Sequence, residues 1–402
     1  IVIYTAVLRM MQNRKKAENA AFLLAAVVCV EMFVASLLNA VSVQEEVGVT
    51  RYGNYLDSNG NEVYSSYTGS IDRIKNVVDK ILDSDKTFYR MESTVYRCNV
   101  NEPMAFGYNG ISHSTSTLNE NVIRMMARMG YASDSHWTKY LGGTPVSDAL
   151  LGIKYVITKN DTLDRNIFNI AAQGEEGYQI VKSDNIIYAM QNTKALSVAY
   201  GVSENIIEDM KELTYPPYIS GLDYQNRLIK SMLSETGVKG DVLKGITASV
   251  GATDCSRSTF NQTHKYNVGD EEKEAINPYY CFEKNGDSPK ALFDFTAPVD
   301  GPIYFHFTSA NFGKTFDVYL KKNDNSAAYI SDCFGTDTKR IMKLGDFKKG
   351  DRVTVELRLK DDALYLSKES KYFFYYIDYT ALNEAFDQLS AAEMYIEKYG
   401  ND

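Results

Sequence analysis

The chain has 402 residues, of which 44% are hydrophobic and 24% charged, with 8 prolines and 26 glycines. This ordinary globular composition excludes wholesale disorder and collagen-like repeats, and the length allows two or three domains. The 43 basic and 52 acidic residues give a net charge of −9, which argues against nucleic acid as a partner.

The first apolar segment, residues 1–8, is too short to cross a bilayer and is followed by a basic stretch. We interpret it as the end of a preceding membrane helix, so the chain is expected to be a piece of a polytopic membrane protein. The basic residues are Arg9, Arg14, Lys15 and Lys16. Short loops rich in Lys and Arg stay in the cytoplasm, which predicts an extracytoplasmic location after about residue 44.

A longer apolar segment follows at residues 20–43, with no Lys or Arg between Lys16 and Arg51. At ~1.5 Å per residue it can cross a hydrocarbon core of ~30 Å, and we therefore predict a transmembrane helix. The alternatives are a secretory signal peptide and a buried core helix. A chain that begins with Ile1 and carries Glu31 in the apolar stretch is not typical of a signal peptide.

Glu31 is the only acidic residue of the predicted span and is our weak candidate for a catalytic residue. A carboxylate inside hydrocarbon must face a partner, water or the interior of a helix bundle. The alternatives are that Glu31 pairs with a polar group on a neighbouring helix that this chain lacks, or that it lies nearer the membrane interface.

The five cysteines divide between the span, which contains Cys29, and the exported part. The exported cysteines are Cys98, Cys255, Cys281 and Cys333. Because exported cysteines can form disulfides, Cys255 and Cys281 are the first candidate pair, although four cysteines allow three connectivities. The four histidines are scattered and no CxxC motif occurs, so we expect no metal site.

Residues 44–240 mix helix and strand patterns. Apolar spacing predicts a helix that Ser70 caps and that ends near Asp83. Further elements are predicted in chain order: a helix at 118–129 that stops at Gly130, a strand at 153–158, a hairpin of 178–181 with 186–190, and a helix at 222–233.

From about residue 240, short alternating runs separated by turn residues indicate an antiparallel sandwich. The runs are 291–296, 302–308, 315–321, 327–331, 340–344, 352–359 and 372–378, followed by a helix at 380–389. The predicted fold class is α+β in three parts. Residues 1–43 hold the end of one membrane helix, a basic loop and one transmembrane helix. Residues 44–240 form a mixed α/β extracytoplasmic domain, and 241–402 a jelly-roll-like β-sandwich domain with a C-terminal helix.

Two polar and aromatic clusters are candidates for ligand binding, because aromatic faces with hydroxyls and amides suit sugars. The first lies in the loop 108–117 and the second around residue 136. Their candidate residues are Tyr108, Asn109, His113, Ser114, His136 and Trp137. The alternatives are a buried connection whose hydroxyls satisfy backbone groups, and simple packing.

Two further sets of charged residues have structural alternatives. Asp148 could act as an acid, but its position favours the first turn of a short helix, where its charge complements the helix dipole. A basic set in the sandwich could meet an anionic polymer, although a solvated strand face explains it as well. This set is Lys339, Arg340, Lys343, Lys348, Lys349 and Arg352.

Several short segments resemble one known family in their order along the chain. They are FYR at 88–90, YNGIS at 108–112, GGTP at 142–145, SDALLGIKYVI at 147–157, YQN at 224–226 and LGDFKKGD at 344–351. Together they resemble the YfhO family of bacterial polytopic membrane proteins over most of the chain after Val43. Family members often have Tyr at the position of His113.

The resemblance implies a function for the parent protein. Such proteins are similar to membrane glycosyltransferases that use polyprenyl-phosphate-linked sugars, which implies glycosylation of envelope polymers such as teichoic acids. The implied partners are membrane lipid, a polyprenyl-phosphate-linked sugar donor and an anionic envelope polymer, and no cofactor is evident in the sequence. Catalytic carboxylates of that superfamily lie on early outer loops, expected before Ile1, so this part would recognise acceptor or donor.

Two alternatives remain. The first is a non-catalytic, membrane-anchored outer domain that binds glycan or a protein. The second is a secreted hydrolase, which is disfavoured because no carboxylate pair stands in a suitable context.

Overall fold

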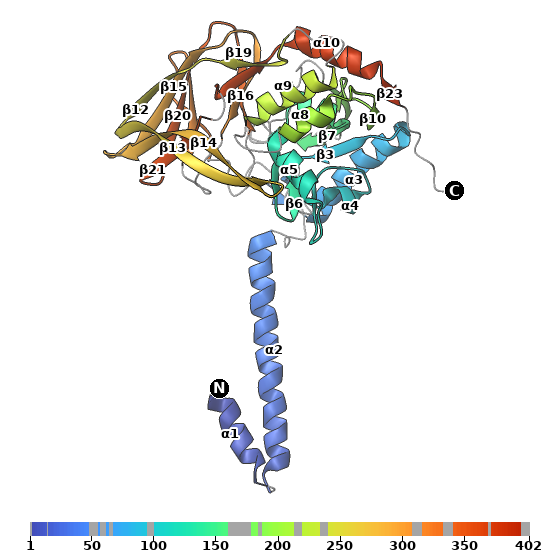
Figure 1. Ribbon diagram of the computed structural model, residues 1–402. Coiled ribbons are helices and arrows are strands. Elements are labelled where there is room, and N and C mark those ends of the chain that lie inside the picture. The colour runs from blue at the N-terminus through green and yellow to red at the C-terminus, as the bar shows by residue number, and fades with distance from the viewer. Residues whose placement is uncertain are drawn as a thin grey trace. The chain divides into compact units, whose positions relative to one another are not determined.

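The computed structural model divides into two compact units, Ile1–Asp72 and Arg73–Asp402 (Figure 1). It describes residues 2–13, 15–47, 55–56, 62–63, 67–94, 100–159, 178–183, 187–212, 219–233, 240–307, 316–332, 341–368 and 371–394.

The first unit contains a helical hairpin of α1 (Val2–Met11) and α2 (Ala17–Val47), with a two-stranded sheet of β1 (Tyr55–Leu56) and β2 (Glu62–Val63). The prediction of one long apolar helix is confirmed. Among the described residues, α2 alone has a segment, Ala17–Ser42, that is long and apolar enough to cross a membrane. Large apolar side chains of α2 are exposed, so the alternative of a buried core helix is not supported.

Helix α3 (Tyr67–Ser84) ends where the apolar spacing predicts and buries its four central apolar side chains, Ile74, Val77, Val78 and Ile81. The prediction that Ser70 caps this helix is wrong, because the helix begins at Tyr67. Serine inside a helix costs only about 0.5 kcal/mol relative to alanine, and the buried downstream face outweighs that cost.

A four-stranded mixed sheet follows, in the order β3 (Arg90–Ser93), β7 (Ile153–Lys159), β9 (Ile187–Asn192) and β8 (Tyr178–Ser183). Strands β3 and β7 are parallel and the other pairs are antiparallel. The predicted strand and hairpin are thereby confirmed, while residues 184–186 of the predicted turn lie outside the described residues.

Short elements surround this sheet, and both predicted amphipathic helices are among them. They are α4 (Glu102–Phe106), β4 (His113–Ser114), α5 (Glu120–Met129), β5 (Ala132–Asp134), β6 (Trp137–Lys139), α6 (Pro145–Leu150), β10 (Ala199–Tyr200), α8 (Ile206–Glu212) and α9 (Gly221–Met232). Helix α5 stops at Gly130 as predicted, because that residue adopts a left-handed φ of +99°.

The strands from Leu243 to Ile377 are antiparallel and form three sheets, which confirms the predicted β-sandwich and the α+β class. The five-stranded sheet runs β12 (Ser249–Thr253), β15 (Lys290–Thr296), β20 (Arg352–Leu359), β17 (Phe316–Lys322) and β18 (Ala328–Asp332). The four-stranded sheet runs β11 (Leu243–Ile246), β22 (Phe374–Ile377), β16 (Gly301–His306) and β19 (Ile341–Phe347). Helix α10 (Tyr379–Ser390) and β23 (Glu393–Met394) follow.

The four-stranded sheet is a common wall between two hydrophobic cores. On one face, Phe305 and Phe374 join the core between the sandwich sheets. On the other face, their chain neighbours Tyr304 and Tyr375 join a core with helices α5, α6, α9 and α10. Strand alternation sends successive side chains to opposite faces, so both cores share one sheet. The core on the helix side thus draws on residues before and after 240, and the domain boundaries remain a prediction.

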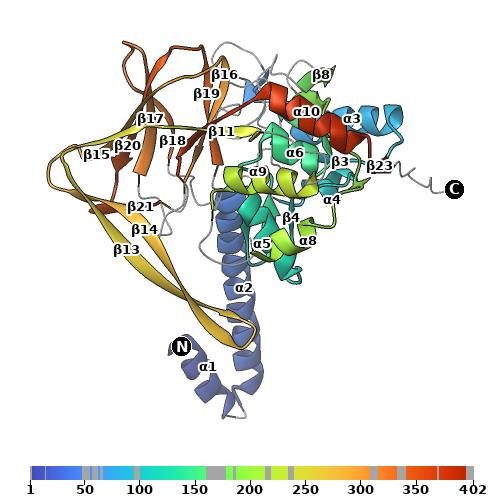
Figure 2. The same cartoon turned by 45° about the horizontal axis from the view of Figure 1, so that its top comes forward.

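The third sheet contains two long strands that the hydrophobic pattern does not reveal. Strands β13 (Cys255–Val268) and β14 (Glu271–Lys284) form a hairpin, and β21 (Ala363–Ser367) pairs with β14. The hairpin extends away from the other strands of the sandwich as a twisted ribbon (Figures 1 and 2). Most side chains of β13 are exposed, so its sequence lacks the apolar alternation on which strand prediction depends.

The candidate disulfide between Cys255 and Cys281 is wrong for this structure, because both thiols are free. In the β13–β14 register, Cys281 lies opposite Ser258, three residues further along the strand than Cys255. That offset is about 10 Å and places the two side chains on opposite faces, beyond the reach of a disulfide. Cys98 and Cys333 lie outside the described residues.

Candidate functional site

A buried hydrogen-bond network holds the loop with the YNGIS motif against β3. Glu92 of β3 is buried and accepts hydrogen bonds from the backbone N–H groups of Ile111 and Ser112, the latter at 2.9 Å. The Ser112 hydroxyl donates to the other carboxylate oxygen at 2.7 Å. Gly110 permits this approach, because a Cβ there would lie 2.7 Å from Glu92 Oε1 and 2.6 Å from Pro103 Cγ.

Burial dominates the ionisation of Glu92 and raises the pKa of its carboxyl to about 7. The hydrogen bonds from Ser112 and Ile111 favour the charged form and oppose this rise, whereas the charge of Asp148 adds to it. The loop is therefore attached to a carboxyl group that is partly protonated at neutral pH.

A second buried carboxylate, Asp148, continues the network. Ser112 Oγ accepts from the backbone N–H of Tyr140 at 2.9 Å, and the Tyr140 hydroxyl donates to Asp148 at 2.5 Å. The Tyr131 hydroxyl donates to the other oxygen of Asp148 at 2.8 Å. As predicted, Asp148 lies in the first turn of a short helix, α6. Both of its oxygens accept from tyrosines inside the protein, which gives it a structural role.

The GGTP and YQN motifs meet at the start of α6. Thr144 caps this helix through a capping box with Ser147, and its hydroxyl donates to Gln225 Oε1 at 2.8 Å. Gln225 Nε2 donates to the carbonyl of Met129, and Asn226 makes two hydrogen bonds with the backbone of Leu243. These motif residues therefore join α5, α6, α9 and β11.

The segment after α3 is tied to β7 by Asp85, whose carboxylate lies 2.6 Å from Lys154 Nζ and 2.8 Å from the Tyr155 hydroxyl. Burial alone would raise the pKa of Asp85, but hydrogen bonds from Lys154, Thr87 and Tyr155 outweigh burial and hold it at about 2. In the FYR motif, the Arg90 guanidinium donates to the carbonyl of Leu151 in the neighbouring SDALLGIKYVI motif. Polar motif residues thus hold the sheet together.

The two predicted binding clusters come together in a small sheet of order β4-β6-β5. Ser114 pairs with Trp137, and His113 pairs with Thr138. The backbone N–H of Thr115 donates to the carbonyl of His136 at 3.0 Å. Sequence alone separates these clusters by about twenty residues, but the structure makes them neighbours above the Glu92–Asp148 network.

The six predicted binding residues differ in exposure. His136 and Asn109 are exposed, and His113, Ser114 and Trp137 are half-buried. His113 Nδ1 lies 2.9 Å from the carbonyl of Ile111, and this contact orients its ring. The ring of Tyr108 is buried and offers no open stacking face. The binding role of all six residues remains a prediction.

Glu31 of α2 accepts a hydrogen bond from the Tyr4 hydroxyl of α1. The structural alternative expected the partner on a helix that this chain lacks, whereas Tyr4 lies on α1 of the same hairpin. A catalytic role of Glu31 remains a prediction.

Three residues of the basic set in the sandwich lie beside acids. Lys343 is buried and lies 3.3 Å from Asp346, Lys348 lies 3.0 Å from Asp300, and Arg352 lies 2.8 Å from Asp324. Lys339 and Arg340 lie outside the described residues. Within the described ranges, no group of three or more His, Cys, Asp or Glu side chains could hold a metal ion.

Sequence reasoning did not single out Glu92, although it is the centre of the buried network. A signal was present: Glu92 follows Met91 in a segment that leads out of the FYR motif into a strand. A charged side chain is expensive to bury, so a buried one needs hydrogen-bond donors nearby in the fold. Those donors lie on a loop about twenty residues later, which no local pattern indicates.

The sequence model of the family described as bacterial membrane protein YfhO matches residues 1–402. A comparison with curated proteins gives no match. A family 35 carbohydrate-binding module from Clostridium thermocellum is 13% identical to this chain, with a TM-score of 0.15. This match covers 30% of the present chain and 97% of the module. Arabinofuranosyltransferase AftD from Mycobacteria is 9% identical to this chain, with a TM-score of 0.20. This match covers 74% of the present chain and 30% of AftD. TM-scores this low carry no argument about fold or function.

Proposed function

Since the chain belongs to the YfhO family of bacterial membrane proteins, we propose that it is the recognition part of a membrane glycosyltransferase that glycosylates cell-envelope polymers. The sugar donor in this proposal is a polyprenyl-phosphate-linked sugar, and the acceptor is an anionic polymer such as a teichoic acid. The catalytic groups lie on other loops of the parent protein.

One observation carries the proposed recognition role. The β4-β6-β5 sheet pairs Ser114 with Trp137, so their side chains share one face, and the Glu92–Asp148 network holds the preceding loop against β3. An aromatic ring beside a hydroxyl group suits the apolar face and the hydroxyls of a sugar. A preorganised surface binds with less loss of conformational entropy.

The proposed topology puts this sheet outside the cell membrane. The basic residues in the last turn of α1 and between the helices, Arg9, Lys15 and Lys16, favour a cytoplasmic position for the turn of the hairpin. The region after α2 then faces the envelope, where acceptor polymers are found. Reporter fusions after Val43 test this: a cytoplasmic signal would rule out the proposal.

The first experiment compares the sugar content of purified anionic wall polymers from the wild type and from a strain that lacks the complete gene. Loss of one sugar supports the glycosyltransferase proposal. Unchanged sugar content in every polymer contradicts it and favours a non-catalytic binding domain.

The second experiment restores the complete gene with single substitutions. Trp137→Ala is expected to lower polymer glycosylation at least several-fold at unchanged protein level. Tyr329→Ala removes an exposed aromatic ring of β18 and serves as the matched control. Equal glycosylation with both variants would exclude the β4-β6-β5 sheet from recognition.

A further inference from the structure

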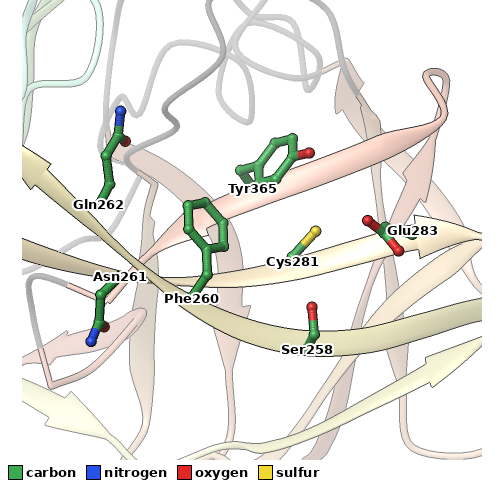
Figure 3. A pocket seen from close by; sticks show the side chains of 7 residues that line it. All are labelled: Ser258, Phe260, Asn261, Gln262, Cys281, Glu283 and Tyr365. Carbon is green, nitrogen blue, oxygen red and sulfur yellow. The ribbon is translucent and has the colours of Figure 1, made fainter.

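The β13-β14-β21 sheet has one face in the sandwich core and one face outside it. Phe282, Leu364 and Leu366 enter the core. Strand alternation sends Cys281 and Tyr365, which are paired in the register, to the opposite face. That face is hollowed into a pocket of 610 Å³ lined by seven side chains (Figure 3). We call it the hairpin pocket.

An aromatic platform forms the apolar part of the hairpin pocket. The ring of Phe260 stacks on Tyr279, with centroids 5.2 Å apart and planes 15° apart. It also meets the ring of Tyr365 at 90°, with centroids 5.5 Å apart. These two contacts fix the orientation of Phe260 while 37% of the residue remains exposed. A fixed, partly open aromatic ring is suited to stack against the apolar face of a ligand ring.

Polar side chains surround this platform. Ser258, Gln262 and Glu283 line the same pocket, and they offer a hydroxyl, an amide and a carboxylate. Aromatic rings together with a few polar groups are a usual combination in a small-molecule site. The ligand must therefore combine an apolar ring face with several hydroxyl groups.

The charge of the hairpin pocket restricts the ligand further. Glu283 is the only charged side chain among its described lining residues. Burial and the neighbouring Glu283 raise the pKa of the Cys281 thiol, which keeps the thiol uncharged at neutral pH. Basic side chains of β13 are engaged elsewhere: Arg257 donates to the carbonyl of Val250, and Lys265 lies 2.8 Å from Glu272. A phosphate or carboxylate would meet repulsion here and find no cation.

An unpaired buried amide lies on the same face. Asn277 is directly opposite Gln262 in the β13–β14 register and is only 5% exposed. Its Oδ1 has no hydrogen-bond partner in the part of the chain that the structure describes. An unsatisfied buried acceptor costs free energy, which a donating hydroxyl of a ligand beside Gln262 would recover.

We propose that the hairpin pocket binds an uncharged saccharide, with Phe260 stacked against a pyranose ring and Gln262 and Ser258 contacting its hydroxyls. This inference rests on the proposed role of the chain in glycan recognition but concerns a different surface. The β4-β6-β5 sheet would meet the acceptor polymer, and the hairpin pocket would hold a neutral sugar unit.

The test uses the full chain, purified in detergent, and titrates it with three neutral tetrasaccharides: maltotetraose, cellotetraose and chitotetraose. Polyglycerol phosphate serves as the anionic probe and an uncharged decapeptide as the protein-like probe. Binding is measured by saturation-transfer NMR and calorimetry. The expected result is millimolar or tighter binding of at least one tetrasaccharide, weakened at least tenfold by Phe260→Ala and by Gln262→Ala.

The matched control is Ile276→Ala, which removes an exposed side chain of β14 on the opposite face of the same sheet. It should leave binding unchanged. A second readout is alkylation of Cys281, followed by peptide mass spectrometry. A bound tetrasaccharide should slow this alkylation in the wild type, which tests the site even if a variant folds poorly.

Three results would overturn the inference: no tetrasaccharide binds, binding is insensitive to Phe260 and Gln262, or the hairpin pocket prefers polyglycerol phosphate or the peptide. Loss of saccharide binding in Trp137→Ala but not in Phe260→Ala would reject the hairpin pocket and leave the proposed function standing. A further outcome separates the two proposals. If wall-polymer sugars are unchanged in the deletion strain but Phe260→Ala abolishes saccharide binding, the glycosyltransferase proposal is rejected and the hairpin pocket is retained as a saccharide site.

Discussion

Around Glu92, polar side chains are buried and donate or accept hydrogen bonds inside the protein, whereas on the β13–β14 hairpin they lie around a pocket. The residues of the YNGIS and SDALLGIKYVI motifs belong to the first region. The second region carries no recognisable motif. The difference teaches that the segments that identify this chain stabilise its framework, while surfaces suited to ligands lie on less distinctive strands and turns.

The strongest test of this comparison is to remove the centre of the buried network. Glu92→Leu leaves two backbone N–H groups and the Ser112 hydroxyl without their acceptor, and is expected to cost about 3–4 kcal/mol of unfolding free energy. Glu92→Gln retains an acceptor and is the matched control, expected to cost about 1 kcal/mol. Urea unfolding in detergent measures both, because the single tryptophan, Trp137, reports on this region. If Glu92→Leu lowered the free energy of unfolding only slightly, the network would not have this structural role.

The next test concerns the glycine of the YNGIS motif. Gly110→Ala introduces a Cβ 2.7 Å from Glu92 Oε1 and 3.0 Å from the carbonyl of Met91, so the loop must shift away from β3. We expect a loss of about 2–3 kcal/mol in the same unfolding assay. Gly251→Ala is the control, since its Cβ would make only an ordinary contact of 3.7 Å with Leu292. Equal stability of the two variants would contradict the close approach.

The pH dependence of stability sharpens the comparison further. The folded pKa of Glu92, about 7, lies above the unfolded value of about 4.3, so the folded chain binds more protons between these pH values. The contribution of the protonated Glu92 carboxyl to the stability of the fold is fully present below about pH 4 and is lost as the pH rises through 7. Between these limits the wild type should lose on the order of 2 kcal/mol relative to Glu92→Gln. Parallel stability curves for the two proteins would show that burial does not shift this group.

The smallest effect on stability is expected on the hairpin. Phe260→Ala removes a partly exposed ring and two ring contacts, and should cost less than about 1 kcal/mol. Thermal unfolding followed by circular dichroism measures this change, with Ile276→Ala as reference. A large loss of stability would mean that the aromatic platform supports the fold and would remove the contrast between the two regions.

Periodic apolar patterns predicted the longer helices and the strands β7 to β9, β15 to β20 and β22, because burial of one face determines them, but not the short helices α4 and α8. Helix α9, strand β7 and strand β20 match the predicted ranges to within a residue or two. The β13–β14 hairpin was not predicted, since polar residues fill both faces over most of β13. Pairing with β14, which is separated from β13 by two residues, stabilises that strand, and apolar alternation within β13 does not indicate such pairing.

The candidate site was predicted in part. Composition identified His113, Ser114 and Trp137 as a polar and aromatic set, but their proximity depends on pairing between β4 and β6. The burial of Tyr108 was not foreseeable from its motif, because it follows from the packing of the loop against β3. The role of Glu92 depends on donors from a loop that approaches only after folding.

The four-stranded sheet that separates the two cores has an evolutionary consequence. A fragment that begins after residue 240 would expose Tyr304, Tyr375 and Ile341 as a wide apolar surface to water. Gly130 at the end of α5 already lies so close to Ile341 that even a methyl group would not fit between them. The sandwich therefore cannot be exchanged between proteins as an independent cassette. Recombination would have to transfer it together with the preceding α/β segment, as one inherited block.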